Sequence, residues 1–102
     1  MIDLKWLQKR IFKNKQDHGF NTTDVYMEFC SAHNELGEAS DDYAYKGGKK
    51  VGEELADAVI YILGIAEMLG YTMEEEILKK VAKIEKRVYT KHDDGSYTKT
   101  EG

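Results

Sequence analysis

The sequence predicts an all-α domain of four helices, and three observations lead to this prediction. The 102 residues include no proline, the residue that interrupts helices most strongly. Apolar residues recur every three or four places, whereas alternation at every second place is weak. Glycines, which are expected to mark helix ends and turns, gather mainly at Gly19, Gly47-Gly48, Gly70, Gly95 and Gly102.

The first helix is expected to span residues 2–17, and the second to run from about residue 24 to residue 44. Gly19 suits the end of the first helix. Residues 21–23 (Asn-Thr-Thr) are types that cap helix starts, and Asp24 suits a first turn because negative charge is favourable there. The apolar stripes are Leu4, Leu7, Ile11 and Phe12 in the first helix, and Val25, Phe29, Ala32, Leu36, Ala39 and Tyr43 in the second.

The third helix, residues 51–69, is apolar nearly all round, which is typical of a helix surrounded by other helices. Gly70 is expected to end it, and Thr72 with Glu75 matches a capping box that starts a fourth helix, running to about residue 89. The residues expected to face inward from that helix are Met73, Ile77, Val81, Ile84 and Val88. The domain is predicted to cover residues 1–90, followed by a polar tail, residues 91–102, that is irregular apart from a turn at Asp94-Gly95.

Composition narrows the class of protein. The formal charge of −4 and the isoelectric point of about 5.4 lack the basic footprint of a nucleic-acid binder. Cys30 is the only cysteine, so no internal disulfide can form, which fits a reducing compartment. We expect no signal peptide, because Asp3 comes early and no long apolar core follows it. The longest apolar stretch, residues 56–69, contains Asp57 and Glu67 and is too short to span a bilayer, so a soluble cytoplasmic protein is expected.

Two acidic motifs stand out within the apolar segments. They are Glu35-Leu36-Gly37-Glu38 in the second helix and Glu54-Leu55-Ala56-Asp57 in the third. Spacing by three residues places both carboxylates of a motif on one face of its helix, one turn apart. Four carboxylates gathered away from water repel one another, so some must become protonated or bind a cation. Because oxygen ligands suit hard divalent cations, the pattern favours a metal site.

Other interpretations of the acidic motifs compete with a divalent metal site. Glu35 and Glu38 match an ordinary solvated pair, which is common in a chain that is 33% charged. The apolar surroundings of Glu54 and Asp57 argue against that interpretation for the second motif, because buried carboxylates are usually paired or bound to metal. A di-iron bundle would need Glu-x-x-His elements, and neither Glu35 nor Glu54 is followed by such a histidine.

The predicted fourth helix carries a basic face. Lys80 and Arg87 lie seven residues apart and so share one side of the helix. They could bind the phosphates of an anion gathered at the metal. The alternative is a solvated face that balances the neighbouring glutamates.

These residues together resemble the signature of the MazG-type all-α nucleoside triphosphate pyrophosphohydrolases. Glu35-x-x-Glu38, fifteen intervening residues and Glu54-x-x-Asp57 follow that signature. Residues 54–63 (Glu-Leu-Ala-Asp-Ala-Val-Ile-Tyr-Ile-Leu) resemble the metal helix of the family, and the stretch from Lys80 to Arg87 resembles its Lys-x-x-x-Asn-x-x-Arg segment. The resemblance extends over about residues 19–89.

The resemblance implies a four-helix MazG-like bundle and hydrolysis of a nucleoside triphosphate between its α and β phosphates, giving monophosphate and pyrophosphate. The expected cofactor is Mg²⁺, with Mn²⁺ as an alternative. The expected metal ligands are Glu35, Glu38, Glu54 and Asp57. A carboxylate not fully committed to metal could act as the catalytic base, and Glu38 is favoured over Glu35.

The remaining expectations concern substrate and assembly. Lys80 and Arg87 would hold phosphates. Lysines 46, 49 and 50 could do so from the loop after the second helix, although lysine loops are more often simply solvated. Trp6 could stack on the base or anchor the first helix. The apolar third helix and the small size predict a homodimer or a dimer of dimers.

Two positions depart from the family pattern. Asn34 stands where the family often has Glu before the first ligand pair, and Ile84 stands where its Asn would fall. Isoleucine cannot hydrogen-bond to a substrate, so Ile84 favours an alternative, a non-catalytic helical module that binds nucleotide or metal. A purely structural helical bundle is the third hypothesis, and it predicts that metal has no effect on the melting temperature.

Overall fold

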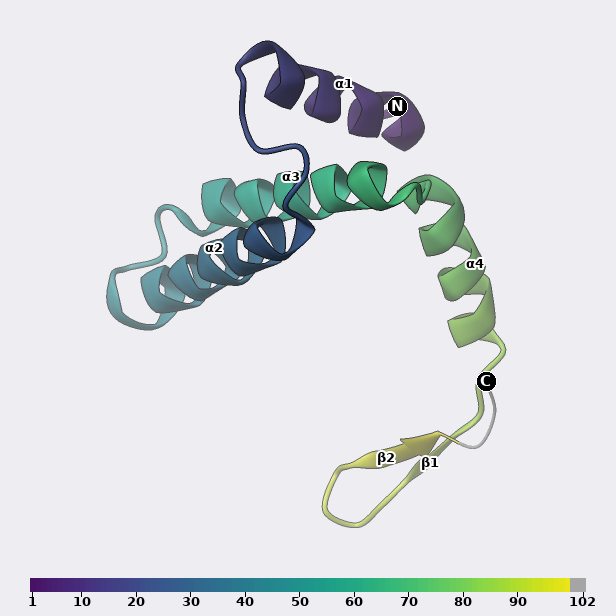
Figure 1. Cartoon of the computed structure of the whole chain (residues 1–102). Helices are drawn as coiled ribbons and strands as arrows, with labels where there is room; N and C mark the ends of the chain where they lie inside the picture. The colour runs from purple at the N-terminus through teal and green to yellow at the C-terminus, as the bar shows by residue number, and fades with distance from the viewer. Residues whose placement is uncertain (100–102) are drawn as a thin grey trace.

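The computed structural model describes residues 1–99 and is mainly helical, with a short hairpin near the carboxyl end (Figure 1). The helices are α1 (Leu4–Asp17), α2 (Val25–Tyr45), α3 (Val51–Leu69) and α4 (Met73–Glu85), and the strands are β1 (Tyr89–Lys91) and β2 (Tyr97–Lys99). The prediction of a mainly helical chain with four helices is confirmed. Residues 100–102, which belong to the predicted tail, lie outside the described part.

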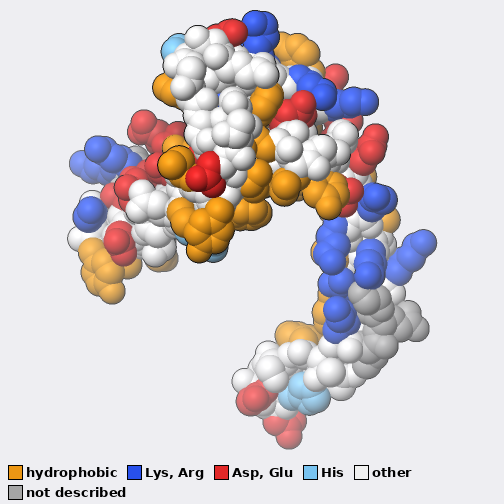
Figure 2. Space-filling model, viewed as in Figure 1, with side chains coloured by type: hydrophobic (Ala, Val, Ile, Leu, Met, Phe, Trp, Pro, Cys, Tyr) orange, Lys and Arg blue, Asp and Glu red, His pale blue; other side chains and the backbone are white. Residues whose placement is uncertain are grey.

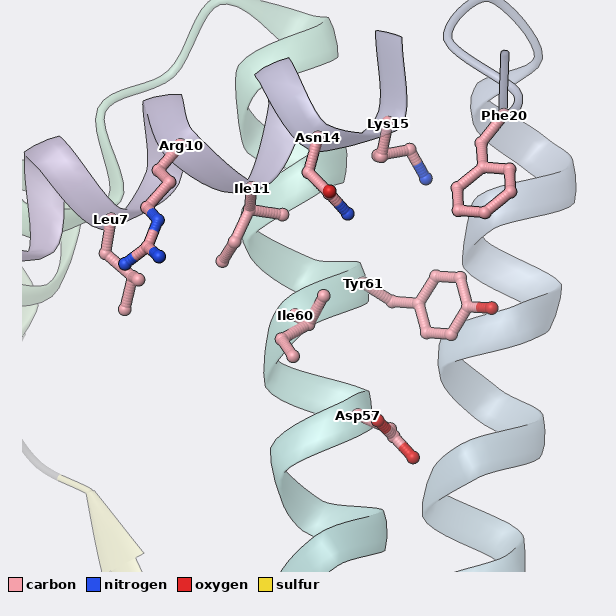
Figure 3. A pocket seen from close by; sticks show the side chains of 9 residues that line it. All are labelled: Leu7, Arg10, Ile11, Asn14, Lys15, Phe20, Asp57, Ile60 and Tyr61. Atoms are coloured by element: carbon pink, nitrogen blue, oxygen red, sulfur yellow. The ribbon is translucent and has the colours of Figure 1, made fainter. Parts of the chain in front are cut away.

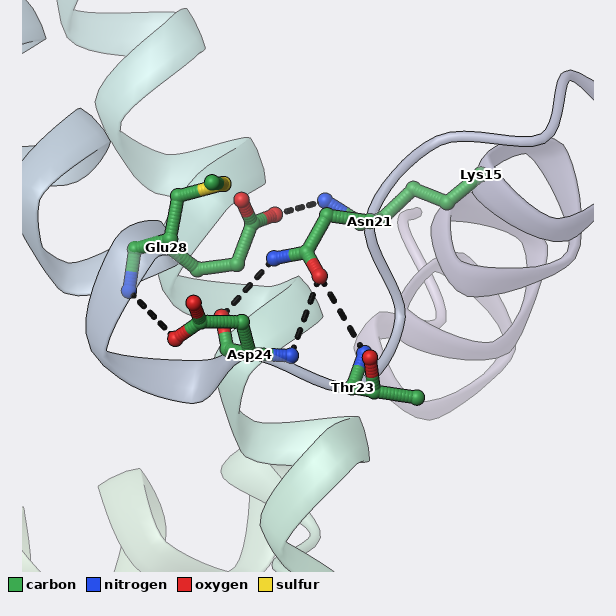
Figure 4. Close-up of polar contacts among 6 residues, drawn as sticks. Lys15, Asn21, Thr23, Asp24 and Glu28 are labelled. Atoms are coloured by element: carbon green, nitrogen blue, oxygen red, sulfur yellow. Dashed lines mark hydrogen bonds and ion pairs between the residues drawn. The ribbon is translucent and has the colours of Figure 1, made fainter.

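Aspartates start the first two helices. The Asp3 carboxylate accepts a hydrogen bond from the backbone N–H of Trp6, and the Asp24 carboxylate accepts one from Met27. Asp24 is thus the N-cap of α2 itself, one position earlier in the helix than expected. Asn21 shapes the preceding loop, because its side chain bonds the backbone of both Thr23 and Asp24 (Figure 4). Side-chain acceptors of this kind satisfy N–H groups that a helix start leaves without a partner.

The compact part of the molecule is formed by α1, α2 and α3. The α2–α3 pair is a helical hairpin, and α1 lies along the second half of α3 (Figure 1). The buried apolar residues are Ala39, Ala58, Leu63, Ile65 and Ala66, mostly from α3. Lys15 from α1 passes over Gly64 and forms an ion pair with Glu28 of α2, with both side chains largely buried (Figure 4). Lys15 therefore links all three helices.

A buried glutamine fastens α1 to the junction between α3 and α4. Gln8 is only 2% exposed, and its amide donates to Glu67 Oε1 at 3.0 Å and to the Tyr71 carbonyl at 2.7 Å. Its own oxygen accepts from the Met73 N–H at 3.0 Å. Gly70, at φ 83°, ends α3 in the left-handed conformation that glycine tolerates best, as expected. Beyond it, α4 turns away from α3 by 105°.

The α4 helix differs from its prediction in three respects. It ends at Glu85 rather than near residue 89. Thr72 is its N-cap residue but makes no side-chain capping bond, so the expected capping box does not form. The residues expected to face inward are also not buried, because α4 contacts α1 only near its start and extends away from the α2–α3 pair (Figure 1). The single chain is therefore not a closed four-helix bundle.

The third helix is likewise not surrounded. Leu55, Val59 and Ile62 are each close to half exposed, although α3 is the most apolar helix of the chain. Cys30 is also exposed, on α2. These departures share a cause, since the apolar surfaces predicted to pack against other helices have no covering element among residues 1–99.

The tail is more regular than predicted. β1 and β2 pair as an antiparallel hairpin in which Tyr89 lies opposite Lys99 and Lys91 opposite Tyr97. The predicted turn at Asp94-Gly95 is confirmed, with Gly95 at φ 90° and the Asp94 carboxylate accepting from the Ser96 N–H and hydroxyl. Among residues 1–99, no single helix is long and apolar enough to cross a membrane, and only α3 with α4, as a bent pair, passes that test of length and composition.

Candidate functional site

The two acidic motifs face each other across the α2–α3 hairpin. Glu35 and Glu38 lie on α2, and Glu54 and Asp57 lie on the first part of α3. Burial raises the pKa of Glu35, and the negative charges of Glu38, Asp57 and Glu54 raise it further, together with a hydrogen bond to Glu38. The four carboxyl groups therefore share one electrostatic environment. Two antiparallel helices joined by a short loop can bring both motifs to the same level in this way.

Glu54 lacks the partner that a buried carboxylate oxygen normally has. Its Oε2 atom is inaccessible to solvent and makes no hydrogen bond. Burial raises the pKa of Glu54, and the charges of Asp42 and Glu38 raise it further, while Lys46 and Lys50 oppose that rise. An unsatisfied buried oxygen with like charges beside it is costly, so this position favours either a proton or a bound cation.

The four carboxylates are close but do not converge on a single point. Among residues 1–99, no three acidic, histidine or cysteine side chains are positioned to hold one metal ion as they stand. The donor chemistry nevertheless fits a hard divalent cation, because all four groups offer carboxylate oxygens and one of these is buried without a partner.

A charged hollow lies beside the site, at the α2–α3 loop. Its volume is about 430 Å³, and its lining residues are Glu38, Asp42, Lys46, Lys49, Lys50 and Glu54. Two of the four motif carboxylates thus form one wall of this hollow.

A second cavity lies on the other side of the site, between α1 and α3 (Figure 3). Its volume is about 440 Å³, and its lining residues are Leu7, Arg10, Ile11, Asn14, Lys15, Phe20, Asp57, Ile60 and Tyr61. The α1 side chains point towards Ile60 and Tyr61, with Phe20 beside Lys15 at one end of the row and Asp57 at the lower end (Figure 3). The wall is mostly apolar and aromatic, with the carboxamide of Asn14 and the guanidinium of Arg10 as its main polar groups.

One of the two cations that line this cavity, Lys15, is already engaged. The Lys15 ammonium pairs with Glu28 and lies 5.6 Å from the centre of the Tyr61 ring. Burial lowers the pKa of Lys15. The Lys15 ammonium is therefore committed to Glu28 while it lies beside the Tyr61 ring.

The predicted phosphate ligands are not brought to the carboxylates within one chain. Lys80 lies on α4 and lines a shallow hollow with Met73, Glu76, Ile77, Lys79 and Lys83. Arg87 follows the end of α4 rather than lying on the helix. Lys and Arg side chains gather over this part of the molecule, well away from the start of α3 (Figure 2).

Trp6 also lies apart from the site. It is 56% exposed on α1, and the Arg10 guanidinium stacks over its ring at 5.1 Å from the centre. The aromatic rings that line the cavity beside Asp57 are instead Phe20 and Tyr61. Sequence reasoning missed Tyr61 in this role, although its spacing of four residues from Asp57 places the two on one face of α3.

Asp42 is the other residue that sequence reasoning missed. It is 6% exposed and follows Glu38 by four residues, so the acidic face of α2 continues by one more turn. That spacing was a usable signal. No sequence signal pointed to Asn14 and Phe20, because their closeness to Asp57 depends on how α1 packs against α3.

The chain was also compared with known proteins. No family model, no curated protein sequence and no solved structure matches it.

Proposed function

We propose that the protein is a Mg²⁺-dependent nucleoside triphosphate pyrophosphohydrolase that gives nucleoside monophosphate and pyrophosphate. The single observation that carries this proposal is the group of four carboxylates on two facing helices, in which burial and neighbouring negative charges raise the pKa of Glu35 and of Glu54, and in which one oxygen of Glu54 is buried without a partner. The resemblance of the two acidic motifs to the MazG-type signature points to the same reaction.

The carboxylates would have two tasks. Glu35, Glu38, Glu54 and Asp57 would hold the ion, which when bound neutralises phosphate charge and acidifies water. One carboxylate would accept the proton of the attacking water while the water oxygen joins the α-phosphorus and pyrophosphate leaves with the bridging oxygen. Glu38 and Glu35 are the candidates for this base.

The cavity between α1 and α3 suits the nucleoside. A volume of about 440 Å³ lies in the range of small-molecule sites, and its wall combines apolar and aromatic side chains with few polar groups. Asp57 joins this cavity to the carboxylates. The rings of Phe20 and Tyr61 could contact a base, and the Asn14 carboxamide could bond its edge. These residues replace Trp6 as the candidates for base recognition.

We further propose that the active form is a homodimer or a dimer of dimers. A groove of about 560 Å³ runs along the α2–α3 pair, lined mostly by apolar residues including Phe29, Leu36 and Val59. Hydrophobic side chains gather along this side of the helices (Figure 2). The amphipathic α4 has no buried residue in one chain. Packing α4 of one copy on the exposed apolar surface of another would cover both, and would carry Lys80 and Arg87 towards a second subunit.

The direct test of activity is incubation with a panel of nucleoside triphosphates and Mg²⁺, with detection of pyrophosphate. Release of pyrophosphate and monophosphate in equal amounts is the expected result. Release of orthophosphate instead would assign cleavage to another bond. A non-catalytic nucleotide-binding module, which Ile84 favours, predicts binding of triphosphate without either product. Ile84 is 43% exposed on α4, where asparagine could be introduced as Ile84→Asn to test whether activity rises.

The assembly is tested by light scattering at micromolar concentration. The expected mass is twice or four times that of the 11.7 kDa chain. Val59→Lys, which introduces a charge into the apolar groove, should shift the population towards monomer, whereas Lys13→Glu on the exposed face of α1 should not. A wild-type monomer at this concentration would remove the dimer proposal.

A further inference from the structure

The hollow beside the α2–α3 loop contains three positive and three negative side chains that remain apart from one another. Among residues 1–99, none of Lys46, Lys49 and Lys50 forms an ion pair with a carboxylate. Glu38, Asp42 and Glu54 nevertheless line the same hollow of about 430 Å³. Separated charges of both signs around an open space suit a ligand that also carries both signs, such as a divalent ion bound to a polyphosphate.

The loop that carries the lysines is anchored at both of its ends. The Asp42 carbonyl accepts hydrogen bonds from the N–H groups of Lys46 and Gly48, at 3.1 and 3.0 Å. The Asp42 carboxylate accepts one from the Lys50 N–H at 2.8 Å. Gly47 and Gly48 both have positive φ, which lets the chain turn within so short a loop. Asp42 therefore fixes the backbone from which the three ammonium groups extend.

The start of α3 adds a further favourable field. Lys50 is the N-cap residue, and no side chain makes a capping bond at this end of the helix. The first N–H groups of a helix have no partner within it and attract anions. An anion in the hollow would therefore meet the lysines and the positive end of α3 together.

The two hollows beside the carboxylates differ in chemistry, and this difference predicts which end of the substrate lies in each. The cavity at Asp57 is mostly apolar and aromatic, whereas the hollow at Glu38 and Glu54 is ionic. We infer that Lys46, Lys49 and Lys50 hold the β- and γ-phosphates of the substrate and retain pyrophosphate after cleavage, while the nucleoside lies against α1. This inference rests on the proposed function and names the part of its substrate that occupies the α2–α3 loop.

The test is calorimetric titration of pyrophosphate, with excess Mg²⁺, into the full chain and into the triple variant Lys46→Gln, Lys49→Gln, Lys50→Gln. The matched control removes the same charge elsewhere, as Lys5→Gln, Lys91→Gln, Lys99→Gln. The triple variant should bind pyrophosphate about tenfold or more weakly, because each lost charged hydrogen bond weakens binding. The control should bind as the wild type does. Nucleoside monophosphate, which lacks the β- and γ-phosphates, should bind all three proteins alike.

Lys49→Gln alone serves as a second variant, since the Lys49 backbone makes none of the loop's hydrogen bonds. It should show part of the loss with unchanged helical circular dichroism. Equal pyrophosphate affinity in the wild type and the triple variant would overturn the inference, as would a wild type that binds no pyrophosphate. If the triple variant binds pyrophosphate more weakly than the wild type but the wild type shows no turnover, the phosphate site at the three lysines would be supported. That result would count only against the proposed hydrolase activity.

Discussion

The two ends of α3 treat a glutamate in opposite ways. At the carboxyl end, Glu67 is paired with the Lys9 ammonium at 2.8 Å and accepts from the Gln8 amide, and these bonds lower its pKa. At the amino end, Glu54 has an oxygen without a partner, and burial with neighbouring acids raises its pKa. One helix thus carries a glutamate that stabilises the fold and another that the fold leaves unsatisfied. A glutamate with an unsatisfied oxygen and a perturbed pKa, such as Glu54, is typical of a ligand site.

The different roles of Glu54 and Glu67 can be tested by neutralising each glutamate in turn and measuring activity. Glu54→Gln should lower pyrophosphate release by more than about 100-fold, since loss of even an outer partner of a metal ligand typically costs 10–100-fold. Glu67→Gln is the matched control, with the same change in charge and helix, and should leave kcat within about twofold. Similar kcat values for the two variants would mean that Glu54 has no special role.

The next effect concerns the three hydrogen bonds of the Gln8 side chain, called here the Gln8 brace. Gln8→Ala removes three hydrogen bonds at the α1, α3 and α4 junction and should lower the free energy of unfolding by about 2–3 kcal/mol. Gln16→Ala, on the exposed side of the same helix, should change it by less than about 0.5 kcal/mol. Urea denaturation followed by circular dichroism measures both. A Gln8→Ala protein as stable as the wild type would show that the junction is held mainly by other contacts.

A smaller effect is expected from metal. Mg²⁺ at tenfold above its Kd should stabilise the wild type by about 1.4 kcal/mol, because a ligand that binds only the folded state adds to its stability. Thermal melts with and without Mg²⁺ test this. Glu67→Gln should retain the shift and Glu54→Gln should lose most of it. An unchanged melting temperature in the wild type would favour the purely structural bundle.

The smallest effect is a pH dependence of opposite sign at the two ends of α3. The raised pKa of Glu54 and Glu35 means that the metal-free fold favours their protonated forms, so this contribution is present below the ordinary pKa near 4.5 and is lost as pH rises through the raised values. The lowered pKa of Glu67 gives stability above that ordinary pKa, which is lost as pH falls through its folded value.

Thermal melts of the metal-free protein between pH 4.5 and 7, a range chosen from about the ordinary glutamate pKa upwards, isolate the first contribution. The melting temperature should fall slightly with rising pH, and Glu54→Gln should flatten that slope. Glu67→Gln should leave it unchanged within this range. A slope that Glu54→Gln does not alter would indicate that the Glu54 carboxyl is already ionised without strain.

Local patterns predicted the helices and the acidic motifs, because both depend on residues three or four places apart. Gly70 and the spacing of Glu35, Glu38, Glu54 and Asp57 illustrate this. Contacts between distant parts of the chain were not predictable in the same way. Gln8 meets Glu67 and Met73 only because α1 packs along α3, and a lone glutamine gives no sequence signal for such a contact.

The surroundings of α4 show a different limit. Its apolar stripe predicts a surface that packs against another element, but periodicity does not say whether that element belongs to the same chain. Ile77 and Val81 are therefore well patterned and still exposed in one chain. The hairpin of β1 and β2 escaped prediction because strands of three residues are too short to show alternation.

One consequence of the Gln8 brace concerns movement. The same short helix that carries Gln8 to the α3–α4 junction presents Leu7, Arg10 and Ile11 to the cavity beside Asp57. A displacement of α1 would therefore alter the wall of the cavity and the hydrogen bonds at the start of α4 together, because one helix supplies both.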